Sequence, residues 1–135
     1  MSTTLAVVRI GLHVLAASVW VGGQITMVAL LPALRRAGGD VPKQAARHFN
    51  RVAWPFFGLA VVTGIWNVAE ISVADRSTGY QVALLIKLSI VALSGLAAYQ
   101  HATATRRSAL AIWGAIGGVT ALLAMFFGAI LVTSS

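Results

Sequence analysis

The chain has 135 residues, of which 59% are hydrophobic and only 10% are charged. This composition lies outside the range of soluble globular proteins. The net charge of +7 therefore does not indicate a nucleic-acid partner, because the basic residues fall in short tracts between apolar runs. Cysteine is absent, which excludes a disulfide framework and a thiolate metal site.

Four apolar segments are long enough to be transmembrane helices, and they cover about residues 5–34, 52–73, 80–102 and 109–132. Each has the roughly 20 residues needed to cross a hydrocarbon core about 30 Å thick, where a helix satisfies its own backbone. The first segment is too long for a signal-peptide core and no small-residue cleavage site follows it, so we expect a retained helix. The sequence predicts an all-α integral membrane protein, with a single domain built as a four-helix up-down bundle.

The linkers between these segments differ in charge, and this difference predicts the orientation. The first linker is basic and carries Arg35, Arg36, Lys43, Arg47 and Arg51. The third carries Arg106 and Arg107, and the second carries Glu70, Asp75 and Arg76. Because basic linkers stay on the cytoplasmic side, we expect both termini on the periplasmic side of a bacterial inner membrane. Arg9, near the outer end of the first helix, is expected to snorkel to that surface.

One layer in the outer half of the membrane collects polar or polarisable side chains from all four segments. Counting about 1.5 Å per residue along each helix places these residues in it: His13, Thr63, Trp66, Lys87 and Met125. Ionisable groups inside a span are costly and usually face the protein interior, where they mark a site. The structural alternatives are a Lys87 stem that reaches the surface and a hydrogen bond from His13 to a hydroxyl such as Thr63 or Ser94.

Two further histidines, His48 and His101, lie at the inner ends of the second and third segments. We interpret them as interfacial rings, and a second ligand pair is the other alternative. Trp20 lies too deep for an interfacial aromatic belt, so its indole N–H is expected to have a partner inside the bundle. Gly114 and Gly118 form a GxxxG motif that suits helix packing or a dimer face.

An imidazole and a thioether at a similar depth suit copper(I) or haem iron. His13 and Met125 are therefore the candidate metal ligands. A neutral histidine and a charged lysine are also suited to positioning an anionic group or relaying protons. Spacing alone does not choose between these chemistries.

Three stretches of the chain resemble the copper resistance protein D domain family: "LHVLAASVWVGG", "RVAWPFFGLAVVTGIW" and "TGYQVALLIKLSIVALSGLAAYQHATATRR". That family shows an early histidine, a Trp-x-Gly-Gly element, a Thr-Gly pair and Tyr-x-x-x-Leu-Leu-x-Lys-Leu. Here these elements fall on His13, Trp20 with Gly22 and Gly23, Thr63 with Gly64, and Tyr80 with Leu84, Leu85, Lys87 and Leu88. The resemblance covers nearly the whole chain. It implies copper uptake or resistance, with this chain as the four-helix core of an architecture that has about eight spans in larger members.

The chain is also similar to HemJ-type protoporphyrinogen oxidases, which are small four-helix haem b proteins. The run Thr63-Gly64-Ile65-Trp66 fits their Thr-Gly-x-Trp pattern. This resemblance implies that His13 is a haem ligand and Lys87 a second essential group. The Val-Gly-Gly that follows Trp20 and the approach from Tyr80 to Lys87 look more like the copper family.

The leading interpretation is therefore a bacterial inner-membrane protein that binds or transports copper through His13, Lys87 and Met125, supported by Thr63, Trp66 and Trp20. One alternative is a haem-b-binding membrane oxidoreductase of the protoporphyrinogen oxidase type, and a second is a structural membrane subunit without its own site. The expected partners are the lipid bilayer, a second copy of the chain, since four spans enclose little interior volume, and a periplasmic copper or redox protein.

Overall fold

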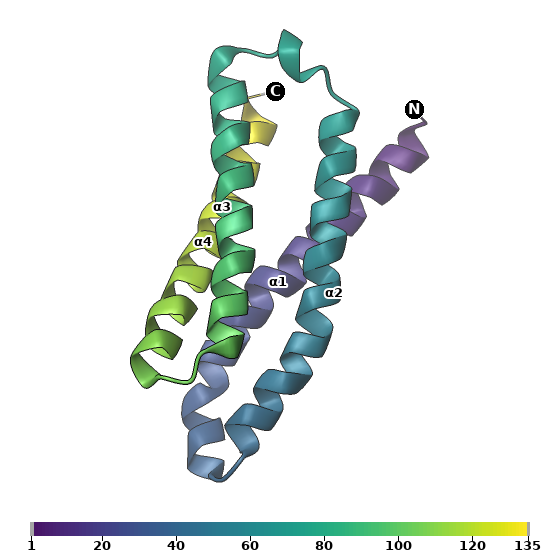
Figure 1. Cartoon of the computed structure of the whole chain (residues 1–135). Helices are drawn as coiled ribbons and strands as arrows, with labels where there is room; N and C mark the ends of the chain where they lie inside the picture. The colour runs from purple at the N-terminus through teal and green to yellow at the C-terminus, as the bar shows by residue number, and fades with distance from the viewer. Residues whose placement is uncertain (1, 135) are drawn as a thin grey trace. The chain divides into compact units, whose positions relative to one another are not determined.

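The computed structural model describes residues 2–134 and is all-helical. Its four long helices, drawn in Figure 1, are α1 (Thr3–Ala37), α2 (Val41–Ala69), α3 (Thr78–Thr103) and α4 (Arg107–Thr133), and the short 3-10 helix η1 (Val73–Asp75) precedes α3. Each of the four is long and apolar enough to cross a membrane. The predicted all-α class is confirmed, and so is the presence of four helices long and apolar enough to span a membrane; the second predicted segment, about residues 52–73, runs past the end of α2 at Ala69.

Local sequence explains where the helices begin and end. The hydroxyls of Ser2 and Ser77 accept hydrogen bonds from the backbone N–H groups of Leu5 and Tyr80, so serine caps the start of α1 and of α3. The chain turns from α1 into α2 through Gly38, Gly39 and Asp40, and both glycines have positive φ, at 76° and 55°. Glycine adopts such angles at no steric cost, which permits this three-residue connection.

The second helix begins earlier than its apolar segment. α2 starts at Val41, whereas the apolar run was predicted from about residue 52. The intervening residues, from Lys43 to Arg51, include alanine, glutamine, lysine and arginine, which are good helix formers. With 35 residues, α1 is about 52 Å long, so it too exceeds the thickness of a hydrocarbon core.

The first compact unit spans residues 1–71 and contains α1 and α2. The two helices pack antiparallel, since His13 contacts Thr63 whereas the later Trp20 contacts the earlier Phe57. The ring centroids of Trp20 and Phe57 are 4.4 Å apart, and Trp54 packs edge-on against both rings. This aromatic cluster lies two helical turns from His13 along α1.

The second compact unit spans residues 72–135 and contains η1, α3 and α4. These helices are also antiparallel, because Lys87 lies beside Gly128 whereas His101 lies beside Gly114. Many of the buried residues on the two helices are small: Ser94, Gly95, Ala97, Gly117, Thr120 and Ala121. Small residues allow helix backbones to approach closely. The single four-helix bundle with both termini outside stays a prediction.

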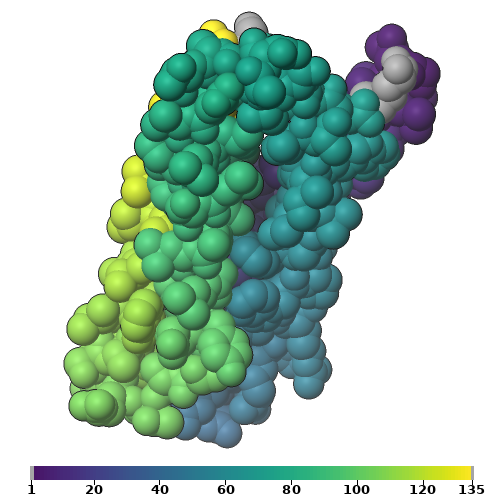
Figure 2. Space-filling model, turned by 45° about the horizontal axis from the view of Figure 1, so that its top comes forward, coloured from purple at the N-terminus to yellow at the C-terminus, as the bar shows by residue number. Residues whose placement is uncertain are grey.

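Large apolar side chains are exposed along every helix. Val28 of α1 is 72% exposed, Leu85 of α3 66% and Val132 of α4 75%. In the space-filling view of Figure 2, side chains of α3 lie at the surface along much of the helix. Exposed apolar surface on this scale is untypical of water-soluble monomers and fits helices that face lipid.

Candidate functional site

The central contact of the first unit joins His13 of α1 to Thr63 of α2. The imidazole Nδ1 lies 2.9 Å from the Thr63 hydroxyl oxygen. Thr63 is only 2% exposed, and His13 is half-buried. The structure thus contains the hydrogen bond from His13 to a neighbouring hydroxyl that was the structural alternative for this residue. The ring is turned toward α2.

The hydrogen bonds of Thr63 fix which ring nitrogen of His13 carries the proton. A hydroxyl has one hydrogen, and the Thr63 hydroxyl donates it to the carbonyl of Leu59 at 2.7 Å, with a second, longer contact to Ala60 at 3.2 Å. The same oxygen therefore accepts from His13, so Nδ1–H is the donor. In the neutral ring the lone pair is then on Nε2.

Gly64 provides the space for the ring of His13. A Cβ atom at position 64 would lie 3.3 Å from Cε1 and 3.8 Å from Nδ1 of that ring. Thr63 and Gly64 thus act together. Thr63 accepts a hydrogen bond from Nδ1–H of the ring, and Gly64 leaves room for the ring. In metal-binding histidines, the ring nitrogen that does not bind the metal usually donates such a hydrogen bond, which orients the ring.

Arg9 and Asn67 lie one helical turn from this contact, toward the start of α1 and the end of α2, at positions i−4 from His13 and i+4 from Thr63. Arg9 does not snorkel as expected: its side chain is 8% exposed. Its Nε and Nη1 atoms, and the Oδ1 atom of Asn67, are buried and have no hydrogen-bond partner. The helical i, i+4 spacing in both segments is the sequence signal that relates these residues to the site.

Lys87 is half-buried on α3. Its Nζ atom would lie 3.3 Å from a Cβ at Gly128 of α4. The lysine thus extends across to the neighbouring helix within its own unit. Gly128 serves Lys87 as Gly64 serves His13, by leaving room for a polar side chain between two helices.

Met125, the second candidate metal ligand, is 48% exposed on α4. Its thioether is therefore not enclosed by its own helical unit. His13 and Met125 belong to different units, and their joint coordination of a metal stays a prediction.

Two tryptophans were predicted to support the site. Trp66 donates its indole N–H to the Glu70 carboxylate at 3.2 Å, which ties it to the end of α2. Trp20 is 6% exposed and packs in the aromatic cluster with Trp54 and Phe57. Trp20 therefore serves the packing of α1 against α2, whereas the hydrogen bond of Trp66 stays within α2 and its cap.

His48 and His101 are both exposed. Nδ1 of His101 donates to the carbonyl oxygen of Leu110 at 2.8 Å, and the His101 ring lies against Gly114, where a Cβ would be 3.1 Å from two ring atoms. Gly114, half of the GxxxG motif, thus makes room for a histidine of the same hairpin, whereas a Cβ at Gly118 would meet nothing within 4 Å. His48 belongs to the other unit, so a pairing of the two histidines stays untested.

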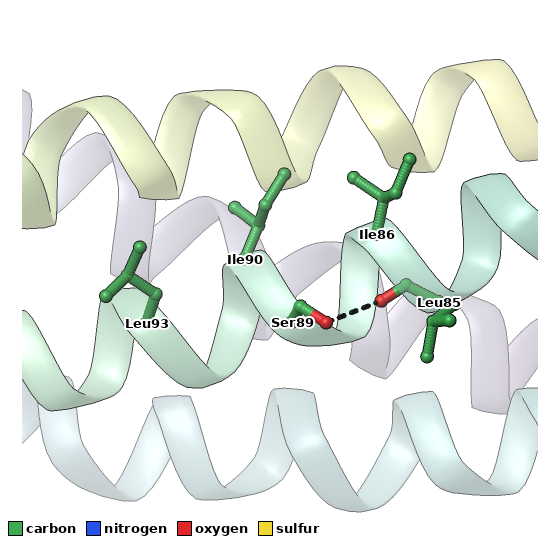
Figure 3. Close-up of a pocket in the computed structure, with 5 residues that line it drawn as sticks. All are labelled: Leu85, Ile86, Ser89, Ile90 and Leu93. Carbon is green, nitrogen blue, oxygen red and sulfur yellow. Dashed lines mark hydrogen bonds between the residues drawn. The ribbon is translucent and has the colours of Figure 1, made fainter.

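A shallow apolar groove runs along α3 and is lined by Leu85, Ile86, Ser89, Ile90 and Leu93. In Figure 3 the side chains of Ile86 and Ile90 point toward α4, and Leu85 points away from it. The Ser89 hydroxyl donates to the carbonyl of Leu85 at 2.9 Å. The one hydroxyl of the groove thus bonds to its own helix, and the rest of the lining is apolar.

Among residues 2–134, no three His, Cys, Asp or Glu side chains come together as a group that could hold a metal ion. Comparison of the chain with protein-family models, curated proteins and solved structures finds no match. The resemblances to the copper and haem families therefore stay interpretations of the sequence. What the structure adds is local: an oriented imidazole, with a buried arginine one turn away.

Proposed function

We propose that this chain is a multi-pass protein of a bacterial inner membrane that handles copper(I), with His13 as its central ligand. The observation that carries the proposal is the hydrogen bond from Nδ1 of His13 to Thr63. It holds the ring in one orientation, with Nδ1 donating to Thr63 as the second ring nitrogen of a metal-binding histidine commonly does. Neutral imidazole and thioether are donors that suit copper(I).

The second ligand in this proposal is Met125 of α4. Lys87 of α3 is the ionisable side chain that supports the site. Met125 is 48% exposed, so its side chain is accessible to an incoming ion. A site with few ligands suits transfer of an ion, since binding must be weak enough for the ion to leave. Copper is therefore treated as cargo rather than as a resident cofactor.

The orientation is part of the proposal and rests on the linkers. The connection from α1 to α2 lies among Arg35, Arg36, Lys43 and Arg47, and the connection from α3 to α4 contains Arg106. By the positive-inside rule these ends are cytoplasmic and both termini are periplasmic. His13 is then on the periplasmic side of the membrane, accessible to copper delivered by a periplasmic partner.

Copper(I) binding to the purified full-length chain tests this proposal. An anaerobic competition against a colorimetric copper(I) chelator would be measured for the wild type, His13→Ala and Met125→Ala. We expect saturable binding by the wild type that weakens in both variants. The matched control is His48→Ala, which removes an exposed imidazole from α2 and should bind as the wild type does. Equal binding by the wild type and His13→Ala would contradict the proposal.

Haem b is the second candidate ligand, and one observation favours it. A haem iron can be held by a single protein imidazole, and among the described residues of α1 and α2, His13 is the one histidine within the outer half of the hairpin. The imidazole of His13 would hold the iron, and the haem would supply redox chemistry. If the wild type shows a Soret band and His13→Ala does not, the ligand held by His13 is haem and not copper.

The remaining alternative is a structural subunit. In that case the His13–Thr63 hydrogen bond only joins two helices, as polar groups do in many membrane proteins. His13→Ala would then lower the stability of the protein while neither copper nor haem binds to the wild type.

A further inference from the structure

The outer end of the α1–α2 hairpin contains two neighbouring levels of polar side chains. The inner level is the hydrogen-bonded pair of His13 and Thr63. The outer level is Arg9 and Asn67, each four residues further along its helix toward the same end. At this level the polar atoms are buried without partners: Nε and Nη1 of Arg9 and Oδ1 of Asn67.

A buried guanidinium with unpaired N–H donors is costly. Removing one ion from water costs several kcal/mol unless a counter-charge or hydrogen bonds replace its hydration, and arginine stays charged in proteins. Nε and Nη1 together carry three N–H donors. An arginine that is 8% exposed in a candidate membrane span therefore indicates that a partner binds there.

The acids of the first unit do not provide that partner. Among its described residues these are Asp40 and Glu70. Asp40 lies in the connection between α1 and α2, at the opposite end of the hairpin. The Glu70 carboxylate accepts a hydrogen bond from the indole of Trp66.

We propose that Arg9 and Asn67 form a binding site for an oxyanion, the phosphate of a lipid headgroup or the carboxylate of an apolar molecule. The guanidinium provides charge-assisted hydrogen bonds to either group. The amide of Asn67 adds a further donor when it is rotated by half a turn, which exchanges its oxygen and nitrogen without changing its shape.

The position of the site suits an amphiphile. Arg9 is six residues from Thr3, the first residue of α1, which corresponds to about 9 Å along the axis. In the orientation proposed above, this end of α1 lies toward the periplasmic headgroups, where a charged group can bind while its apolar part stays in lipid. The surrounding residues of α1 suit such a tail, since Leu5 and Val8 are each nearly half exposed.

This inference is independent of copper, because it concerns Arg9 and Asn67 rather than the ligands of the metal. It also explains how a cation can bind at His13 only one turn from a guanidinium. A bound oxyanion offsets the charge of Arg9 and removes the repulsion that the cation would otherwise meet.

Thermal unfolding of the full chain in an uncharged detergent tests the inference. Three probes are added at increasing concentration: dioleoyl phosphatidylglycerol, laurate, and dodecanol as the uncharged match to laurate. We expect the wild type to show a saturable rise in melting temperature with at least one anionic probe and none with dodecanol. Arg9→Gln should need at least about tenfold more of that probe, because a charge-assisted hydrogen bond is worth about 1.5–3 kcal/mol.

The control variant is Arg36→Gln, which removes an exposed arginine from the same helix and should respond as the wild type does. If Arg9→Gln does not fold, Arg9→Lys and Asn67→Ala replace it, and both should weaken the response. A response to phosphatidylglycerol alone identifies a lipid phosphate, and a response to laurate alone identifies a carboxylate. No response by the wild type, or the same response in Arg9→Gln as in the wild type, overturns the inference.

Discussion

The ring of His13 occupies the space that Gly64 leaves on the facing helix. A Cβ atom at position 64 would lie only 3.3 Å from Cε1 of the ring. The hydroxyl oxygen of the neighbouring Thr63 accepts a hydrogen bond from Nδ1–H of the ring. Two consecutive residues of α2 therefore determine both the place and the orientation of one imidazole on α1.

Substitution of Gly64 by alanine should displace this ring. We expect Gly64→Ala to have a lower free energy of unfolding than Gly58→Ala by about 1 kcal/mol, because overpacking costs about 1–3 kcal/mol and offsets the gain in helix propensity. Gly58 is the matched control on the same helix, since a Cβ there would meet nothing within 4 Å. Unfolding in mixed micelles of mild detergent and SDS measures the difference, and equal stabilities would show that the ring does not need this space.

Loss of the Thr63 hydroxyl should leave the Nδ1 proton of His13 without its acceptor. Thr63→Val keeps the shape of the buried side chain, and we expect it to cost about 1–3 kcal/mol of stability and about 10- to 100-fold in copper affinity. Thr63→Ser keeps a hydroxyl and should retain most of the affinity. The two variants are compared by the same chelator competition as the wild type. A Thr63→Val protein that binds copper as tightly as Thr63→Ser would show that this hydrogen bond does not orient the ligand.

The two glycines of the GxxxG motif in α4 should respond differently to alanine. Gly114→Ala places a Cβ 3.1 Å from two atoms of the His101 ring, whereas a Cβ at Gly118 meets nothing within 4 Å. We therefore expect Gly114→Ala to be less stable than Gly118→Ala by about 1 kcal/mol. The free energies of unfolding give the answer, and size-exclusion chromatography gives the oligomeric state. Dissociation of a dimer by Gly118→Ala would instead identify the motif as a dimer face.

The proposed orientation predicts which introduced cysteines a membrane-impermeant maleimide can label. The chain has no cysteine of its own, so each introduced thiol is unique. In intact spheroplasts we expect labelling of Ser134→Cys, near the C-terminus, and protection of Thr105→Cys, in the connection between α3 and α4. Permeabilised cells provide the control, since both variants should then react. Labelling of Thr105→Cys alone in intact spheroplasts would reverse the orientation.

The four helices were predictable because membrane spans have a simple signal. An apolar run of about 20 residues requires no knowledge of tertiary contacts. The start of α2 was not predicted, since hydropathy identifies the part of a helix that can lie in lipid and misses its polar extension, here residues 41–51. Helix propensity in the run from Lys43 to Arg51 was the signal for that extension.

The candidate site was predictable in part for the same reason. A histidine inside an apolar segment has few polar partners within reach, and Thr63 was among the hydroxyls expected to hydrogen-bond to His13. The burial of Arg9 was not predicted, because a long side chain near a helix end can usually reach water. Its place opposite Asn67 depends on the register of the two helices, which single segments do not encode. The roles of Gly64, Gly114 and Gly128 likewise require knowledge of which side chain faces each glycine.

The most direct test of the account is a single measurement on purified wild-type protein and His13→Ala. Both samples are exposed to copper(I) under anaerobic conditions and separated from unbound ion, and the copper content and absorption spectrum of each are recorded. We expect a colourless wild type that retains copper and a His13→Ala protein that retains much less. Equal copper in the two samples, or a Soret band in the wild type that is lost in His13→Ala, would contradict the assignment of His13 as a copper ligand.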